Sequence, residues 1–310
     1  FAPDYGLNLN RLDIPVDPYE AFRCDVPNLS TSLYFVVNDQ FYTKALPKVT
    51  PGDGIIVDSL AHAAVEHHDI VAKYYAKAAK MKEDAITALN TMLAQDGLFV
   101  YVPKNTRCDR TIQVINILRS DVDMMVNRRV LIVLEEGAEA KFLFCDHSAD
   151  DRNFLATQVI EAFVGDNASL ELNCLEETHY KNVRVSNVYI DQQRDSRVNH
   201  NVITLHNGTT RNQLDLVFKG EGAECSCNGC VIADKQQHVD NNTLIDHQVG
   251  HCTSNELYKY VLNDASVGAF AGKILVRHGA EKTLSQETNQ NLCATKQARM
   301  FTQPMLEIYA

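Results

Sequence analysis

Four segments of this 310-residue chain share one pattern: GAEAKFLF (137–144), GDNASLEL (165–172), GEGAECSC (220–227) and HGAEKTLS (278–285). In each, a turn is followed by a small residue and then by alternating side chains. Gly137 and Gly165 are 28 residues apart, Gly165 and Gly220 are 55 apart, or about two such intervals, and the last interval is irregular. One coil of this length cannot bury its inner face without a neighbour, so the repeat favours stacked coils. An antiparallel sandwich, which also has many short strands, is the alternative.

Residues 97–310 are predicted to be β structure throughout. Short segments rich in Val, Ile, Leu and Phe follow one another, and no helix-length segment separates them. A βαβ architecture is therefore not expected. Closer to the start, LYFVVN (33–38) and GIIVDSL (54–60) also have the composition of strands, and residues 1–60 are expected to form short strands and turns.

Residues 60–95 have a different character, being rich in Ala, Lys, Glu, Leu and Met. Apolar side chains recur at helical spacing, at Ile70, Tyr74, Ala78 and Met81 and again at Ile86, Leu89 and Leu93. The spacing predicts one long helix or two short ones, ending before Gly97. We therefore divide the chain into residues 1–96, with N-terminal strands and a helical segment, and residues 97–310, the β-helix core.

Composition and net charge limit the classes of function that the chain can have. The net charge of −11 disfavours nucleic-acid binding, which needs clustered Lys and Arg. No segment approaches the roughly 20 apolar residues needed to cross a bilayer, so no membrane association is expected. Nine cysteines without a recognisable leader indicate free thiols and a cytoplasmic location. Because Phe1 is not an initiator Met, we interpret the chain as the core of a longer polypeptide.

The segment ECSCNGC (224–230) is the sharpest candidate for a metal site. The thiolates of Cys225, Cys227 and Cys230 could hold zinc or part of an iron–sulfur cluster. However, C-x-C on a strand points both sulfurs to one face, and in a β-helix that face is often the packed interior, where Cys acts as a small apolar residue. Core packing is therefore the preferred interpretation. A thiol-based metal-binding or storage module is the alternative.

Other motifs point away from catalysis. In DHQVGHC (246–252), His247 and His251 would share one side of a helix, but the flanks predict a turn between strands, so a structural role is expected. The sequence contains no G-x-x-x-x-G-K-[ST] and no G-x-S-x-G. A β-helix carbohydrate-active enzyme is a remote alternative, because no tight carboxylate set recurs at coil spacing and Trp is absent.

Three blocks resemble the SufB/SufD family of iron–sulfur cluster assembly proteins: ITALNTMLAQDGLFVYVPKN (86–105), VDNNTLIDHQVGHCTSNELYKYVLNDASVGAFAGKILV (239–276) and LEIYA (306–310). The SufD branch fits better, since Asn289, Gln290 and Asn291 occupy the region of SufB's cluster-building cysteine and Cys293 falls a few residues later. The resemblance implies a right-handed parallel β-helix. The family's flanking helical domains, one of which binds the ATPase SufC, would be largely absent here, and its iron-handling Cys and His would lie beyond Ala310.

The resemblance also implies a function. It is that of a non-enzymatic scaffold that pairs with SufB, is coupled to SufC, and takes part in iron acquisition and nascent cluster assembly. No resident cofactor is expected in this segment, only transient iron or a cluster at the interface with SufB. An open solenoid end can add a partner's strand, and alone it would pair with its own copy as a homodimer. The interface is expected at Thr302, Gln303, Pro304, Leu306, Glu307, Ile308 and Tyr309.

Overall fold

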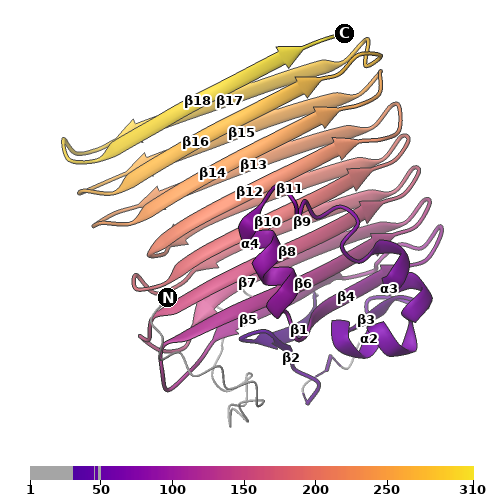
Figure 1. Ribbon diagram of the computed structural model, residues 1–310, viewed down its shortest axis with the longest axis horizontal. Helices are drawn as coiled ribbons and strands as arrows, with labels where there is room; N and C mark the ends of the chain where they lie inside the picture. Colours follow the sequence, from indigo (N-terminus) through magenta and orange to yellow (C-terminus); the bar gives the residue numbers. More distant parts are fainter. Residues whose placement is uncertain (1–30, 45, 48–49) are drawn as a thin grey trace.

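The computed structural model describes residues 31–44, 46–47 and 50–310, and the prediction for residues 1–30 lies outside this part. The described chain winds into a solenoid made of two facing nine-stranded sheets (Figure 1). Sheet A contains β1 (Thr31–Val37), β2 (Gln40–Phe41), β5 (Thr111–Leu118), β7 (Glu139–Ser148), β9 (Ser169–Glu177), β11 (Arg197–His206), β13 (Glu224–Ala233), β15 (Thr253–Leu262) and β17 (Leu284–Cys293).

Sheet B is formed by the strands that alternate with these along the chain. Its members are β3 (Ile56–Ser59), β4 (Gly97–Val102), β6 (Met124–Leu134), β8 (Phe154–Val164), β10 (Val183–Gln192), β12 (Thr209–Phe218), β14 (His238–His247), β16 (Val267–Val276) and β18 (Arg299–Ile308). Each coil therefore consists of one strand from each sheet and the two turns that join them.

Neighbouring coils pair in parallel. The ten residues of β16 and the ten of β18 run in register, and the same holds for β15 and β17. In the part of the chain that the structure describes, only the β1–β2 and β3–β4 pairs are antiparallel. The predicted parallel β-helix is confirmed, and the antiparallel sandwich is not what forms.

From β5 onward, the turn before each sheet A strand contains a residue with a left-handed backbone. From β7 onward these residues are Gly137, Asn167, Asp195, Gly222, His251 and Gly279, which follow one another at intervals of 27 to 30 residues. At Gly137 a Cβ atom would lie 2.4 Å from Asn105 Oδ1 of the preceding coil, so only glycine fits there. The repeat seen in the sequence is thus one coil. The 55-residue interval from Gly165 to Gly220 spans two coils, since the intervening turn at 193–196 has no glycine.

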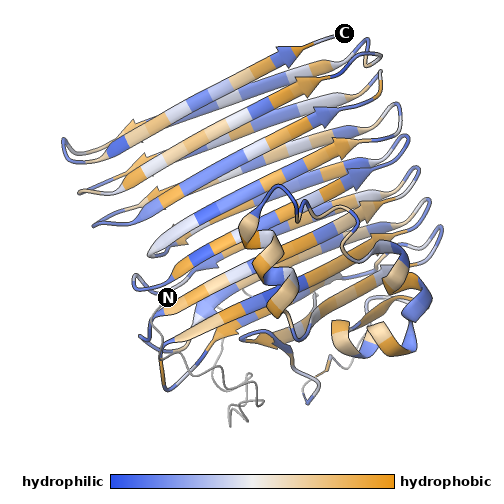
Figure 2. Cartoon of the chain, viewed as in Figure 1, coloured by the Kyte–Doolittle hydropathy of each residue, from blue (hydrophilic) through white to orange (hydrophobic). Residues whose placement is uncertain are grey.

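A small buried residue follows each of these turns and starts the inward face of the next strand. Ala138, Ala168, Ser196, Ala223, Cys252 and Ala280 occupy this corner and are all buried. Along the strands, inward and outward side chains then alternate, as in β16, where every second residue is buried. Figure 2 shows the resulting mixture of polar and apolar bands on the strands of sheet B.

The helical region differs from the prediction. It forms three short helices, α2 (Leu60–Glu66), α3 (His68–Tyr74) and α4 (Ala85–Leu93), not one or two. Helical geometry ends at Tyr75, and Ala76 has a left-handed backbone with φ 58°. Of the apolar positions that suggested a continuous helix, Ala78 and Met81 fall in the loop between α3 and α4.

The cause of this break is a carboxylate on the sheet below. Glu161 of β8 accepts hydrogen bonds from the backbone N–H groups of Ala76 at 2.8 Å and of Ala78 and Ala79 at 2.9 Å. It also pairs with Arg129 of β6, and both side chains are fully buried. These N–H groups bind Glu161 instead of continuing the helix, because a buried charge needs several donors.

Helix α4 is anchored on the outside of sheet B by polar groups. The buried side chain of Asn90 donates to Arg128 O at 3.0 Å and to Thr157 Oγ1 at 2.9 Å. Thr87, one turn earlier, contacts the hydroxyl of Tyr189 at 2.8 Å. None of the apolar side chains of α4 is fully buried, and Met92 is exposed. Figure 1 shows α4 lying across the strands of sheet B.

The division at residue 96 stays a prediction. Strand β4 begins at Gly97, but β1 of the first segment pairs with β5 and β3 pairs with β4, so both sheets contain strands from both segments.

Among the described helices none has both the length and the apolar character needed to cross a membrane.

We predict that Glu161→Ala lowers the free energy of unfolding by about 3–5 kcal/mol, because it leaves Arg129 buried without its carboxylate. The measurement is urea unfolding at neutral pH. Glu136→Ala is the control, since Glu136 pairs with Lys104 at 3.0 Å in an exposed position, and its loss should stay below about 1 kcal/mol. Equal losses in the two variants would contradict this account of the anchor.

Candidate functional site

The C-terminal end of the solenoid is open in the described chain. Strands β17 and β18 are the last members of their sheets, and each has a partner on one side only. Their other edges carry unpaired backbone N–H and C=O groups, which can pair with a strand from another chain. Figure 1 shows the two strands together at the top of the molecule.

The core is also uncovered at this end. Leu306 and Ile308 of β18 pair in register with Ile274 and Val276 of β16, so they occupy the inward positions of the last coil. Ile274 and Val276 are 2% and 5% exposed, whereas Leu306 and Ile308 are 59% and 61% exposed. The difference reflects the absence of a further coil over β18 among the described residues. This end therefore offers apolar surface as well as hydrogen-bonding groups.

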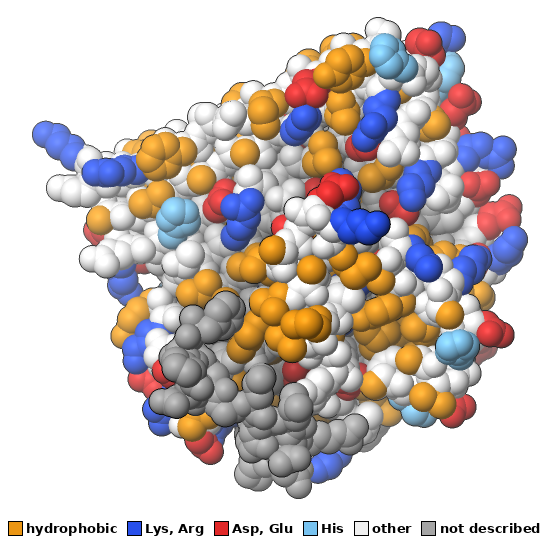
Figure 3. All heavy atoms as spheres, viewed as in Figure 1, with side chains coloured by type: hydrophobic (Ala, Val, Ile, Leu, Met, Phe, Trp, Pro, Cys, Tyr) orange, Lys and Arg blue, Asp and Glu red, His pale blue; other side chains and the backbone are white. Residues whose placement is uncertain are grey.

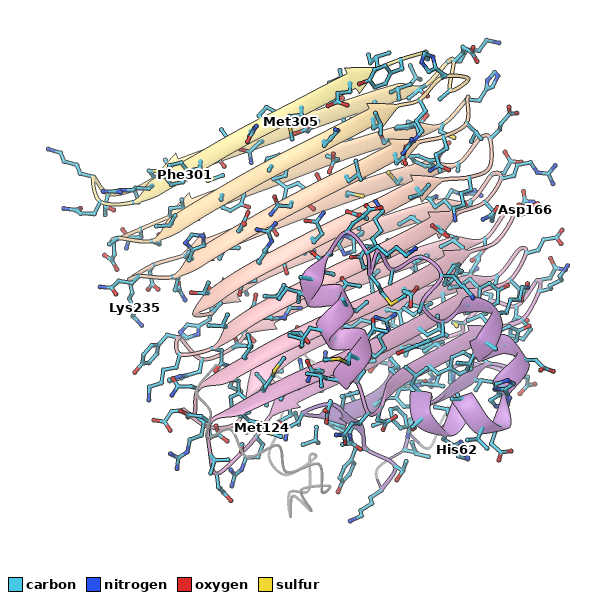
Figure 4. The ribbon with its side chains drawn as sticks, viewed as in Figure 1. His62, Met124, Asp166, Lys235, Phe301 and Met305 are labelled. Carbon is cyan, nitrogen blue, oxygen red and sulfur yellow. The ribbon has the colours of Figure 1, made fainter. Side chains whose placement is uncertain are left out.

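The structure puts all seven predicted interface residues on or directly after β18, but on two faces. Thr302, Pro304, Leu306 and Ile308 are in register with the buried residues of β16, whereas Gln303, Glu307 and Tyr309 alternate with them. Glu307 pairs with Lys273 of β16 at 2.8 Å. Phe301 is also exposed, and no pattern in the sequence had singled it out. Figure 4 labels Phe301 and Met305 along this strand, and Figure 3 shows hydrophobic side chains at the same edge.

Pro304 interrupts the open edge of β18. The N–H groups of Arg299 and Tyr309 donate toward β16, to O of Ser266, which directly precedes β16, at 3.0 Å and to Val276 O at 2.8 Å. Because successive N–H groups of a strand point to opposite sides, the odd-numbered residues face β16 and the even-numbered ones face the open side. Pro304 has no N–H, so the open row lacks one donor near its middle.

The three candidate thiols do not converge. Cys225 and Cys227 of β13 are buried in the core, whereas Cys230 lies on the outer face and is exposed. Cys227 lies beside Cys225, and this thiol neighbour together with burial holds the pKa of Cys227 well above its usual range. Protonated buried thiols are poor ligands, because the thiolate is the metal-binding form. No group of three or more His, Cys, Asp and Glu side chains in the described chain is arranged to hold a metal.

The two histidines of DHQVGHC lie apart in the fold. His247 ends β14, is buried and contacts Ser254 Oγ at 2.9 Å, while His251 is in the following turn with φ 59°. The predicted turn between strands is confirmed. Burial lowers the pKa of His247 to about 4, so the ring is neutral.

Sequence reasoning missed a column of ionisable side chains inside the solenoid. In register on successive strands of sheet A lie Leu172, His200, Cys227, Glu256 and Glu287. Neighbouring strands are about 4.8 Å apart, so each side chain stacks on the next. Its first side chain, that of Leu172, is apolar, and the side chains that follow toward the open end are ionisable. The alternation of each strand could have revealed it, but only once the register between coils was known.

Glu256 and Glu287 end this column without a cationic partner. Neither carboxylate oxygen of Glu256, nor Glu287 Oε1, has a hydrogen-bond partner in the described structure. Burial raises the pKa of Glu256 to about 8, and the charge of Glu287 adds to the shift. A Cβ at Gly272, on the facing strand β16, would lie 2.2 Å from Glu287 Oε1, so the absence of a side chain there makes room for this carboxyl group.

The chain matches family models along nearly its whole length. The model described as "SUF system FeS cluster assembly, SufBD core domain" matches residues 116–310, and the model described as "SufBD protein N-terminal region" matches residues 1–114. The first of these covers more than half of the chain, including β6 to β18 and the open end.

Similar proteins carry corresponding names. The chain is 26% identical over 292 residues to the iron–sulfur cluster assembly protein SufD of Bacillus subtilis, covering 92% of this chain and 65% of that protein. It is 25% identical to an iron–sulfur cluster assembly SufBD family protein of Synechocystis, covering 96% and 67%. For SufD of Escherichia coli the identity is 26%, covering 73% and 56%. The chain thus spans about two-thirds or less of the length of these relatives.

We predict that Glu256→Gln stabilises the protein at pH 8 by about 2–4 kcal/mol and has little effect at pH 5. The folded-state pKa of Glu256 is raised from 4.5 to about 8, so between these values the folded state holds a proton that the unfolded state has lost. The contribution of Glu256 to the free energy of unfolding is therefore fully present below pH 4.5 and is lost as the pH rises through about 8. Glutamine does not titrate, so the variant lacks this pH dependence. Urea unfolding at both pH values measures it.

The control for this pH dependence is Glu224→Gln, at the exposed start of β13. It should leave the difference in stability between pH 5 and pH 8 as it is in the native protein. If Glu256→Gln shows the same pH dependence as Glu224→Gln, Glu256 is ionised in the folded state and the account of the column is wrong.

Proposed function

Because the chain belongs to the SufBD family of the SUF system for iron–sulfur cluster assembly, we propose that it acts there as a non-enzymatic scaffold subunit. The observation that carries the proposal is that, in the described chain, the edges of β17 and β18 and the apolar side chains of Leu306 and Ile308 are exposed together. A scaffold of this kind works by binding, and this end combines the two features that a stacked partner coil requires.

The proposed partner is a SufB homologue, seated end to end on β17 and β18. Its terminal strands would continue both sheets, and its inward side chains would cover Leu306 and Ile308 in the way that β18 covers Ile274 and Val276. The pairing of Lys273 with Glu307 at 2.8 Å would hold the outer face of β18 in place for this contact. The missing donor at Pro304 favours a partner strand that does not need a hydrogen bond at that point.

Iron or a nascent cluster would be cargo at this joint and not a resident cofactor. The buried thiols and the neutral His247 offer no ligand set of their own, which supports a site shared with the partner. We further propose that a SufC-type ATPase supplies the energy, since the sequence has no phosphate-binding loop. Iron acquisition would take place at the same interface between this chain and the SufB homologue. The interface would form first and would then receive the iron.

The test is co-elution of the full-length protein with the SufB and SufC homologues of its own source on an anaerobic size-exclusion column. The native chain should run as a single complex. Leu306→Asp with Ile308→Asp should reduce the amount of complex at least tenfold, because two carboxylates would be buried at the joint. Ile232→Asp is the control, since Ile232 is 50% exposed on the outer face of β13, away from the end. Separate elution of folded native proteins would sink the proposal.

Without its partner, the protein should pair with its own copy. The same edges and the same apolar side chains are then covered by a second molecule, so we expect a homodimer. Multi-angle light scattering of the native chain and of the Leu306→Asp, Ile308→Asp variant measures this, with a shift from dimer to monomer expected. A native monomer at micromolar concentration, or a variant that stays dimeric, contradicts the prediction.

A further inference from the structure

A small cavity lies inside the solenoid, between the two sheets and away from the open end. It offers about 20 Å³ to the centre of a water-sized sphere. Sheet A contributes Cys174, His200 and Val202 to its walls, and sheet B contributes Arg184, Asn212 and Asn241. Five of these six side chains carry a polar atom.

Two of the lining side chains have polar atoms without a partner. Neither ring nitrogen of His200 forms a hydrogen bond in the described structure, although the side chain is buried. Arg184 Nε is also unpartnered, while its terminal nitrogens pair with Asp146 Oδ2 at 2.7 Å and Asn212 Oδ1 at 2.8 Å. A buried polar atom left in this state costs about 1–3 kcal/mol, so a partner is expected.

The two side chains are chemically complementary. Burial lowers the pKa of His200 to about 4, so the imidazole is neutral at physiological pH and has one nitrogen with a free lone pair. Arg184 Nε–H can only donate. A direct hydrogen bond between them does not form in the structure, but a single molecule that accepts from Arg184 and donates to His200 would satisfy both.

We propose that this cavity is a binding site for an ordered water molecule that bridges Arg184 Nε and a ring nitrogen of His200. The volume exceeds the roughly 10–15 Å³ that one water needs, and polar cavities with two to four available partners are filled by water. An anion is not favoured, because the charge of Arg184 is already shared with Asp146 at 2.7 Å and with Glu176 at 4.0 Å.

Two polar networks of the core have no hydrogen bond between them in the protein itself, and the water would connect them. On one side is the ion-pair network of Asp146 with Arg128 at 2.6 Å and Arg184 at 2.7 Å. On the other is the column that begins at His200 and continues through Cys227. The water would donate to one ring nitrogen of His200 and so fix its tautomer. Without the water, neither ring nitrogen has a hydrogen bond, and the ring lies between Leu172 and Cys227.

The first test is a crystal structure of the native chain at a resolution that shows ordered water. A single spherical peak within about 2.7–3.2 Å of both Arg184 Nε and a His200 nitrogen supports the proposal. Two results overturn it. One is a cavity without density around an ordered His200, and the other is a peak too large or too elongated for water, which would indicate a different ligand.

The second test fills the cavity. Val202→Leu adds a methylene group where Val202 lines the cavity, and Val198→Leu, four residues earlier on the same strand and equally inward, is the matched control. If water is bound, Val202→Leu expels it and should lower the urea midpoint more than Val198→Leu does. Filling a dry cavity has the opposite effect. A higher midpoint for Val202→Leu, or a loss no larger than that of the control, overturns the proposal.

Discussion

The structure depends on one constraint, which is that a coil of two strands cannot bury its own inner face. Each coil is stable only because the next one covers it, as β18 covers Ile274 and Val276 while its own Leu306 and Ile308 stay exposed. Parallel register and the repeated corner of left-handed turn and small residue follow from this rule. The apolar stack therefore holds the strands in order, and in the described chain it also leaves apolar side chains of β18 exposed.

The same rule explains how much of the fold was readable in the sequence. Turn, small residue and alternation recur with the coil, so the β-helix and its strands could be predicted from Gly137, Gly165 and Gly220. Side-chain alternation also placed Cys225 and Cys227 together and correctly favoured the core for them. The break after Tyr75 could not be predicted, because its cause, the carboxylate of Glu161, lies more than 80 residues away on β8. Local spacing in residues 60–95 contains no trace of that contact.

The candidate site was predictable in the same partial way. The end of the solenoid followed from the position of the last strands, but the division of Thr302–Tyr309 between two faces needed the register of β16 and β18. The interior column of His200, Cys227, Glu256 and Glu287 could not be predicted, since each member comes from a different strand and only Cys227 belongs to a motif, ECSCNGC, whose other residues are not in the column. The polar residues of this column are therefore neighbours only across coils, at intervals of about 28 residues. A short sequence motif does not extend over such intervals.

In the described chain the two ends of the solenoid are not equivalent. At the opposite end, the described chain finishes in β2, with two residues, and β3, with four, both antiparallel to their neighbours. Edges so short and reversed in direction give a parallel coil nothing to extend. Growth of the described solenoid by further coils in the same register is therefore directional, from β17 and β18 outward.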